Sequence, residues 1–252
     1  MLDRAIGVLI VGFWLTMMTL LVQRDVVPLL TAGRPPSYKT LLQHRLRSER
    51  YRMGVWWGGR RIGSSATAIH PSGDGSYTLD NDTDLATPFP GLEHVSLSSH
   101  TRIGRAYNLL DFTTKIETGD LSGKIDALVV GDRLRIVFGV GSNRVVHEVP
   151  YDAGGTFSNG LSPFVQMPDL TVGKEWTITS VNPLTGQAES GLARVMEMEK
   201  LAWEGEEVET FRVVLTKGTQ EAASWIDREG RILKEEVPFM SSKLMMIREK
   251  EE

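Results

Sequence analysis

The sequence predicts a mainly β protein in which an antiparallel β domain follows one N-terminal transmembrane helix and a short amphipathic helix. Two observations lead to this fold class. From Tyr51 onward, short runs of alternating apolar and polar residues are separated by Gly, Asn and Asp at intervals of roughly eight to twelve residues, which is typical of antiparallel strands. Before Tyr51 the chain has a long uncharged apolar stretch and then leucines at helical spacing. After that stretch, the rest of the 252-residue chain is long enough for one sizeable domain.

The apolar stretch covers residues 5–22 and ends at Gln23, Arg24 and Asp25. At a rise of about 1.5 Å per residue it spans roughly 27 Å as a helix, close to the ~30 Å hydrocarbon core of a bilayer. The side chains expected to contact lipid include Ile6, Leu9, Phe13, Trp14 and Leu20. A retained signal-anchor is favoured over a cleaved signal, because Ala32-Gly33 is a poor cleavage site, and over a core helix, which normally has a polar face.

The head before this helix, residues 1–4, is predicted to be cytoplasmic and the large domain extracytoplasmic. Arg24 and Arg34, which follow the helix, would by themselves favour the reverse orientation. A long tail is nevertheless translocated largely regardless of its charge. Residues 23–36 then form a spacer whose prolines forbid a continuous helix and favour an extended chain. These prolines are Pro28, Pro35 and Pro36.

Residues 37–50 have the pattern of a basic amphipathic helix. Ser37 can act as its N-cap. Leu41, Leu42 and Leu46 form an apolar stripe among basic residues. This stripe either rests on lipid headgroups or packs on the β domain. Packing is favoured, because three leucines make a modest membrane face.

The β domain is expected to occupy residues 51–249. We expect strands at Arg52–Trp57, Ile62–His70, Ser76–Leu79, Glu93–Ile103, Ala106–Ile116, Gly123–Val130, Arg133–Val140, Arg144–Pro150, Glu175–Ser180, Ala188–Lys200, Glu207–Lys217, Gln220–Ile226, Ile232–Pro238 and Ser242–Arg248. Residues 151–172 interrupt this pattern, since they mix Gly and Pro with large apolar side chains. We expect this loop to be ordered, either across the mouth of an apolar cavity or over an open end of the sheet.

Composition and spacing offer little support for catalysis. The net charge of -4 gives a nucleic-acid partner no electrostatic support. The absence of cysteine excludes disulfides, thiolate metal sites and cysteine nucleophiles. The five histidines are far apart in the sequence and have no metal-binding spacing: His44, His70, His94, His100 and His147. We therefore predict no catalytic residue, no metal and no cofactor.

Two acidic groups have structural interpretations. Asp80, Asp82 and Asp84 alternate as in a calcium loop, but Leu85 and Gly91 occupy the places of its glycine and its final glutamate. A solvated loop between strands is therefore expected. Six glutamates are expected to form an acidic hairpin that protects against edge-to-edge association. They are Glu197, Glu199, Glu204, Glu206, Glu207 and Glu209.

Part of the chain resembles exported β domains of the periplasmic lipoprotein-carrier-like type, including those found ahead of bacterial transglutaminase-like domains. The segments that carry the resemblance are Leu170–Ile178, Asn182–Gln187, Glu209–Gly218, Ala223–Val237 and, for the first hairpin, Tyr51–Gly58 with Arg61–Gly63. Within Ala223–Val237, Trp225 is expected to anchor in the core, while Asp227 and Gly230 build a turn. The chain lacks a transglutaminase-like Cys-His-Asp set and a lipid-modified cysteine.

This resemblance implies a curved, half-barrel-like antiparallel sheet around an apolar space that holds lipid or acyl chains. Six side chains are candidate contacts of such a ligand, in the cavity or its lid: Trp56, Phe157, Phe164, Met167, Trp176 and Trp225. We expect a non-catalytic protein of the bacterial inner membrane, single-pass, with its C-terminal domain in the periplasm. The alternative is a structural subunit whose anchor docks to other membrane proteins. An enzyme is the least favoured interpretation.

Overall fold

A computed structural model describes residues 13–20, 33, 38–42, 47–86, 94–151, 157–158, 167, 169–181, 188–239 and 242–250. Helix α3 comprises Tyr38–Leu42. The strands are β1 (Glu49–Trp57), β2 (Arg60–Pro71), β3 (Tyr77–Ala86), β4 (His94–Ile103), β5 (Leu109–Thr118), β6 (Leu121–Val130), β7 (Arg133–Val140), β8 (Asn143–Pro150), β9 (Phe157–Ser158), β10 (Glu175–Val181), β11 (Ala188–Trp203), β12 (Glu206–Lys217), β13 (Gln220–Asp227), β14 (Ile232–Phe239) and β15 (Ser242–Arg248).

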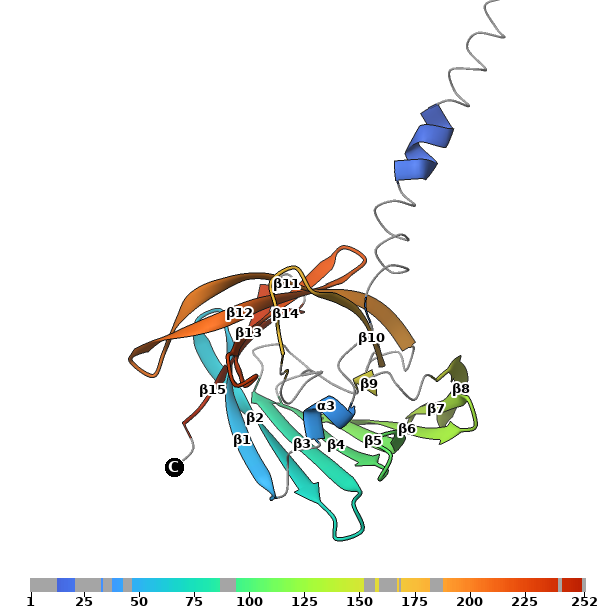
Figure 1. Ribbon diagram of the computed structural model, residues 1–252. Coiled ribbons are helices and arrows are strands. Elements are labelled where there is room, and N and C mark those ends of the chain that lie inside the picture. The colour runs from blue at the N-terminus through green and yellow to red at the C-terminus, as the bar shows by residue number, and fades with distance from the viewer. Residues whose placement is uncertain are drawn as a thin grey trace, which may run out of the picture.

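All these strands belong to one sheet, in the order β8-β7-β6-β5-β4-β3-β2-β1-β15-β14-β13-β12-β11-β10-β9. Strands that follow each other in the sequence therefore pair, except β8 and β9, which lie at the two ends of the sheet, and β1 also pairs with β15. Only β9 and β10 are parallel among these pairs. The sheet bends so strongly that its two arms face each other, with α3 between them (Figure 1). The prediction of a mainly β protein with one open antiparallel sheet is confirmed.

Every predicted strand is present, but β3 is longer than the sequence indicated. It continues through Asp80, Asp82 and Asp84, which were expected to form a loop. Thr83 and Leu85 alternate with these aspartates and are buried, while Asp82 and Asp84 are exposed. The loop prediction was wrong, because the period-two alternation puts these carboxylates on the solvated face of a strand.

The predicted helix 37–50 is largely replaced by other structure. Only α3 is helical among its described residues, and β1 already begins at Glu49, which pairs with Ile69 of β2. The helix prediction was therefore wrong at its C-terminal end, where cross-strand pairing prevails over the leucine spacing. The preference for packing over a membrane face is confirmed, because Leu41 and Leu42 are buried against the sheet.

Two hydrophobic cores lie on the concave side of the sheet. The first, here called the pocket-side core, joins β1 and β15 to the arm of β10–β14 through residues such as Val55, Trp176, Ile226 and Met246. The second, here called the α3 core, lies under α3 on β2–β7. Its buried members are Tyr38, Leu41, Leu42, Ile69, Tyr77, Ile103, Leu109, Phe112, Ile125, Ala127, Leu134 and Ile136.

The predicted anchor lies mostly outside the described residues, including Ile6 and Leu9. Residues 13–20 are helical, and Phe13, Trp14 and Leu20 are exposed. Among the described residues, no helix is both long and apolar enough to span a bilayer. From the predicted spacer, Gly33 is described, and its N–H donates to the Glu175 carbonyl oxygen over 3.0 Å. This contact fixes that part of the spacer beside β10.

The acidic hairpin is formed by β11 and β12, which lie within the sheet order and not at either end of it. Its glutamates make ion pairs with cations: Lys200–Glu207 at 2.8 Å, Arg212–Glu197 at 3.4 Å and Arg228–Glu209 at 2.6 Å. We therefore correct the predicted role, since these charges pair with neighbouring strands and turns and do not guard an end strand of the sheet.

The packing of α3 can be tested by Leu42→Ala. Leu42 is 1% exposed, so the truncation leaves a cavity and is expected to lower the free energy of unfolding by about 2–5 kcal/mol. Urea unfolding of the full chain in mild detergent, followed by tryptophan fluorescence, measures this change. The control is Lys39→Ala on the exposed side of the same helix, which is expected to stay within about 0.5 kcal/mol of wild type. Equal midpoints for both variants would contradict the docking of α3.

Candidate functional site

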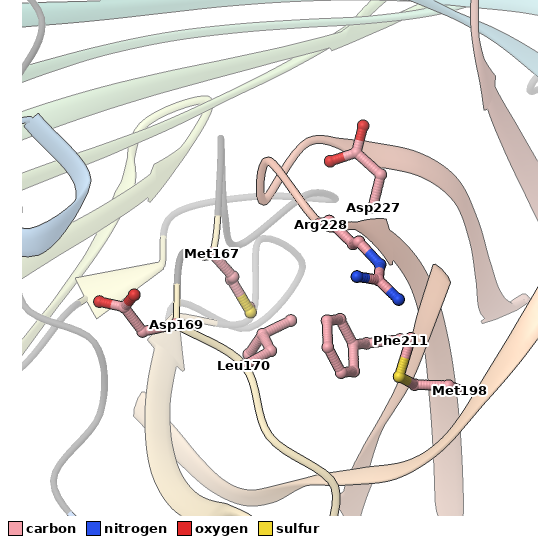
Figure 2. A pocket seen from close by; sticks show the side chains of 7 residues that line it. All are labelled: Met167, Asp169, Leu170, Met198, Phe211, Asp227 and Arg228. Carbon is pink, nitrogen blue, oxygen red and sulfur yellow. The ribbon is translucent and has the colours of Figure 1, made fainter. Parts of the chain in front are cut away.

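A pocket of about 350 Å³ lies at one end of the β11–β14 arm. Its volume is at the lower end of the roughly 300–1,000 Å³ typical of small-molecule sites. Its walls come from the segment before β10, from β11 and β12, and from the turn between β13 and β14 (Figure 2). The lining residues are Met167, Asp169, Leu170, Met198, Phe211, Asp227 and Arg228.

The centre of the pocket is apolar. Met167, Leu170, Phe211 and Met198 point toward one another, as Figure 2 shows. Met198 and Phe211 face each other directly in the β11–β12 register. Met167 and Leu170 are buried, whereas Met198 is 42% exposed and forms the open side. The pocket therefore presents sulfur and aromatic carbon atoms to whatever enters it.

The wall that carries Met167 is attached to the β13–β14 turn. The Met167 N–H donates to the Gly230 carbonyl oxygen over 2.8 Å. The Lys174 Nζ donates to the Asp169 carbonyl oxygen over 3.1 Å and closes this segment onto the start of β10. These two bonds hold Met167 and Asp169 against the sheet.

Asp227 shapes the turn between β13 and β14. Its side chain is buried and accepts from the Arg231 N–H over 2.8 Å and from the Arg231 Nε over 2.7 Å. Gly230 has a φ of +83° and donates its N–H to the Asp227 carbonyl oxygen over 3.0 Å. The predicted turn role of Asp227 and Gly230 is confirmed, and this turn places Arg228 at the pocket.

One cation lies at the rim of the pocket. The Arg228 guanidinium lies over the side of Phe211 and Met198, while the carboxylates of Asp169 and Asp227 point away from the centre (Figure 2). Glu209 holds Arg228 through an Nη2–Oε2 contact of 2.6 Å. An apolar centre beneath a guanidinium suits a molecule with an apolar body and a polar or anionic end.

The six residues that were predicted to contact a ligand lie in different parts of the structure. Met167 lines the pocket. Trp176 is fully buried in the pocket-side core and does not line the pocket. Trp56 pairs with Met245 across the β1–β15 ladder and lies on the face opposite to Val55 and Trp57. Phe157 belongs to β9, and Phe164 lies outside the described residues.

Trp225 lies on the convex face of the sheet. Lys234, its cross-strand partner, has its ammonium 4.2 Å from the centroid of the Trp225 ring. The Arg212 guanidinium lies 6.0 Å from the same centroid, and the indole N–H donates to a Glu199 carboxylate oxygen. Trp225 is 8% exposed, so its predicted burial is confirmed, but charged side chains cover it and it does not line the pocket. Its neighbour Ile226 packs in the core instead.

Sequence reasoning did not select Leu170, Met198, Phe211 or Arg228 as ligand contacts. Met198 and Phe211 face each other in the register that the turn at Glu204 and Gly205 sets, and the β-bulge between Val195 and Glu197 lies further from that turn. Counting outward from that turn pairs Met198 with Phe211, but it does not show that the pair lies at a pocket. Arg228 reaches the pocket only through the β13–β14 turn, which no pairwise spacing reveals.

A row of polar side chains crosses the concave face next to the α3 core. Thr67, Asn81, Ser99 and Thr114 are aligned across β2, β3, β4 and β5. Asn81 Nδ2 donates to the Thr67 hydroxyl oxygen over 2.9 Å, and the Ser99 and Thr114 hydroxyls are 3.0 Å apart. These bonds satisfy polar groups within the interior. The row separates the apolar surface under α3 from the pocket-side core.

The described residues contain no group of three His, Asp or Glu side chains arranged to hold a metal ion. His100 Nδ1 lies 2.7 Å from Asp80 Oδ1, and His70 Nε2 lies 3.9 Å from Asp80 Oδ2. These groups are on the convex face of β2–β4, away from the pocket lining.

Comparison with known proteins shows similarity in fold alone. No protein-family model matches the chain, and no curated protein matches it. A β-barrel-like protein of the domain of unknown function DUF1849 from Brucella abortus is similar with a TM-score of 0.50 and 9% identity, over 82% of this chain and 97% of that one. A DUF1089 family protein from Pseudomonas aeruginosa aligns with a TM-score of 0.42 and 16% identity, over 73% of this chain and 94% of that one. The chain therefore shares a β-barrel-like fold with the Brucella protein.

The charged side chains near Trp225 on the convex face predict that the stability of the fold depends on pH. Burial alone would raise the pKa of Glu236, but the ammonium groups of Lys234 and Lys243, 2.8 and 3.3 Å away, outweigh it and lower that pKa below its ordinary 4.5. A lowered pKa in the folded state adds stability that is present above pH 4.5 and is lost as the pH falls through the lowered value.

Glu236→Gln is therefore expected to reduce the free energy of unfolding at pH 7 by about 1 kcal/mol or less. The difference from wild type should vanish in the acid range below pH 4.5. Urea titrations between neutral and acid pH measure it. Glu117→Gln, at an exposed position on β5, is the control and should leave the pH profile unchanged. A Glu236→Gln deficit that persists unchanged in acid would show that the ion pairs are not its cause.

Proposed function

We propose that the β domain binds an apolar chain, a lipid or acyl group, in the pocket at the end of the β11–β14 arm, without catalysis. The observation that carries the proposal is the convergence of Met167, Leu170, Met198 and Phe211 on an open volume of about 350 Å³. An open apolar surface in water is costly, and covering it stabilises a complex by about 25 cal/mol for each Å². A bound apolar ligand would cover this surface.

The side chains at the centre of the pocket favour a flexible ligand. Methionine has an unbranched, polarizable side chain that adapts to irregular apolar partners, and two of the four central side chains are methionines. The pocket volume is small for a whole lipid, so the pocket would hold one end of a chain. The rest of the molecule would leave the pocket past Met198, which is its exposed side.

The cation at the rim selects the polar end of the guest. Arg228 is held by Glu209 on one side and leaves its guanidinium above the apolar centre. A carboxylate or phosphate placed there gains a charge-assisted hydrogen bond, which an uncharged end does not provide to the same extent. A fatty acid or a phospholipid therefore fits the site better than a plain hydrocarbon.

The fold supports this function in general terms. A strongly curved antiparallel sheet leaves its concave side available to a guest, and the resemblance to periplasmic lipoprotein-carrier-like domains points to lipid or acyl chains. The similarity to the Brucella protein supports the β-barrel-like fold and does not bear on the ligand.

The pocket is tested by Met198→Gln, which keeps the length of the side chain and replaces the thioether by an amide. The amide must be desolvated against an apolar guest, so binding of a pyrene-labelled fatty acid is expected to weaken about tenfold. Fluorescence titration of the full chain measures the dissociation constant. The fold should be retained, because Met198 is exposed.

Met196→Gln is the matched control for this experiment. Met196 is 44% exposed on the same strand and does not line the pocket, so this variant should bind like wild type. Two outcomes would refute the proposal: no binding of the fatty acid by wild type, or equal weakening by the two substitutions.

We also propose that the protein is held in a bacterial inner membrane by residues 5–22, with the β domain in the periplasm. The contact between Gly33 and Glu175 supports a close attachment, because it fixes the chain soon after these residues to β10. A domain attached in this way would act beside the membrane. The same arrangement suits the alternative function, a structural subunit of a membrane complex.

Fractionation of cells that express the full chain tests this location. The chain is expected to stay with membranes after alkaline carbonate extraction, and an added protease should digest the domain in spheroplasts and not in intact cells. Recovery in the soluble fraction, or protection from protease in spheroplasts, would exclude the proposed anchor or its orientation.

A further inference from the structure

The last strand of one arm, β8, is a free edge among the residues that the structure describes. β7 pairs with one side of it, and no described strand pairs with the other. The opposite end of the sheet is different, because Gly33 and β9 both pair with the outer side of β10. A free edge offers unpaired N–H and C=O groups to another strand.

The direction of these groups follows from the β7–β8 hairpin. The Tyr151 N–H, just beyond β8, donates to the Asp132 carbonyl oxygen over 2.8 Å. Because backbone groups alternate along an antiparallel strand, the odd-numbered residues of β8 bond to β7. The even-numbered residues Arg144, Val146 and Glu148 therefore direct their backbone groups to the free edge, and their side chains are exposed on the convex face.

We propose that this edge pairs with the same edge of a second copy of the chain, as an antiparallel two-fold ladder centred on Val146. In that register Val146 faces Val146 of the second copy, and Arg144 faces Glu148 in both directions. At all three positions the backbone N–H and C=O groups point across the free edge. Two such residues placed opposite each other therefore form backbone hydrogen bonds with each other. A two-fold contact of this kind is closed and self-complementary.

Charge selects this register over those centred on Arg144 or on Glu148. A ladder centred on Arg144 would place two guanidinium groups opposite each other, and one centred on Glu148 would do the same for two carboxylates. Like charges directly opposite are destabilising, and opposite charges stabilise. Each Glu148 also makes an ion pair with Arg133 of its own β7, whose Nε lies 3.2 Å from Glu148 Oε2, so that in the proposed register Glu148 has a cation from each copy.

Apolar side chains continue the contact on the convex face. Val137 of β7 pairs with Val146, so the two copies would form a strip of four valines across the axis. Val146 is 49% exposed in the single chain and would be covered by its counterpart. The Arg133 Nη2 lies 3.5 Å from the Glu148 carbonyl oxygen, a weak contact that the backbone of the second copy would replace.

The first experiment uses opposite charge reversals, Arg144→Glu and Glu148→Arg, in full-length chains with different affinity tags in mild detergent. Wild type should be a dimer by light scattering. Each variant alone should self-associate at least about tenfold more weakly, because like charges then oppose each other twice.

A mixture of the two charge-reversal variants should recover the dimer. In the mixed pair the introduced glutamate of one chain faces the introduced arginine of the other, and the unchanged Glu148 of the first faces the unchanged Arg144 of the second. Sequential purification on the two tags, followed by light scattering, measures the mixed dimer. A monomeric wild type, or a mixture no more dimeric than its components, overturns the proposal.

A second experiment tests where the two-fold axis of the proposed ladder lies. The chain has no cysteine, so Val146→Cys introduces a single thiol. In the proposed ladder the two copies of this residue have Cα atoms about 5.5 Å apart, within the range of a disulfide. Mild oxidation should convert most of the chain to a covalent dimer. Leu128→Cys, 51% exposed on the convex face of β6, is the control and should stay monomeric on a denaturing gel. Equal cross-linking of both would show that the contact is not centred on β8.

Discussion

The pairing of β1 with β15 is the contact on which the rest of this structure depends. Every other antiparallel ladder joins strands that follow each other in the sequence, so each of those contacts is local. The β1–β15 ladder joins the two ends of the domain, with Val55 opposite Met246 and both side chains in the pocket-side core. It costs the loop-closure entropy of nearly the whole domain and is expected to form late in folding. Without it the chain would have two separate meanders.

The curvature of the joined sheet creates two different interiors on one concave surface. Under α3 the surface is closed by the helix and forms the α3 core, in which Leu42 and Phe112 are buried. In the other arm Met167 packs in the pocket-side core and is held by the bond from its N–H to the Gly230 carbonyl oxygen. A polar row that contains Asn81 and Thr114 lies between the two. This arm holds the pocket with the apolar centre, which is why we propose that the ligand binds there.

The two ends of the sheet differ in what pairs with them, and this difference bears on what each end can contact. At β10 the end of the sheet receives Gly33 and β9, so the chain that leads from the proposed anchor lies on that side. At β8 the described chain supplies no further strand, and the edge has alternating charge with valine at its centre. One end of the sheet thus receives the chain that follows the proposed anchor, and the other is the edge that we propose pairs with a second copy.

The sequence by itself determined the local structure of this protein and little of its site. Period-two alternation depends on neighbouring residues alone, so most strands from Arg52 to Arg248 could be predicted, except β9 and the second half of β3, and so could the turn of Asp227 and Gly230. Tertiary structure decided which face of each strand is concave, because this depends on the sheet curving as a whole. For that reason Trp225 lies under Lys234 on the convex face, while Met198 and Phe211 meet in the pocket. In the β12–β13 register Arg212 faces Trp225 and Phe211 faces Ile226, so Phe211 and Trp225 lie on opposite faces of the sheet.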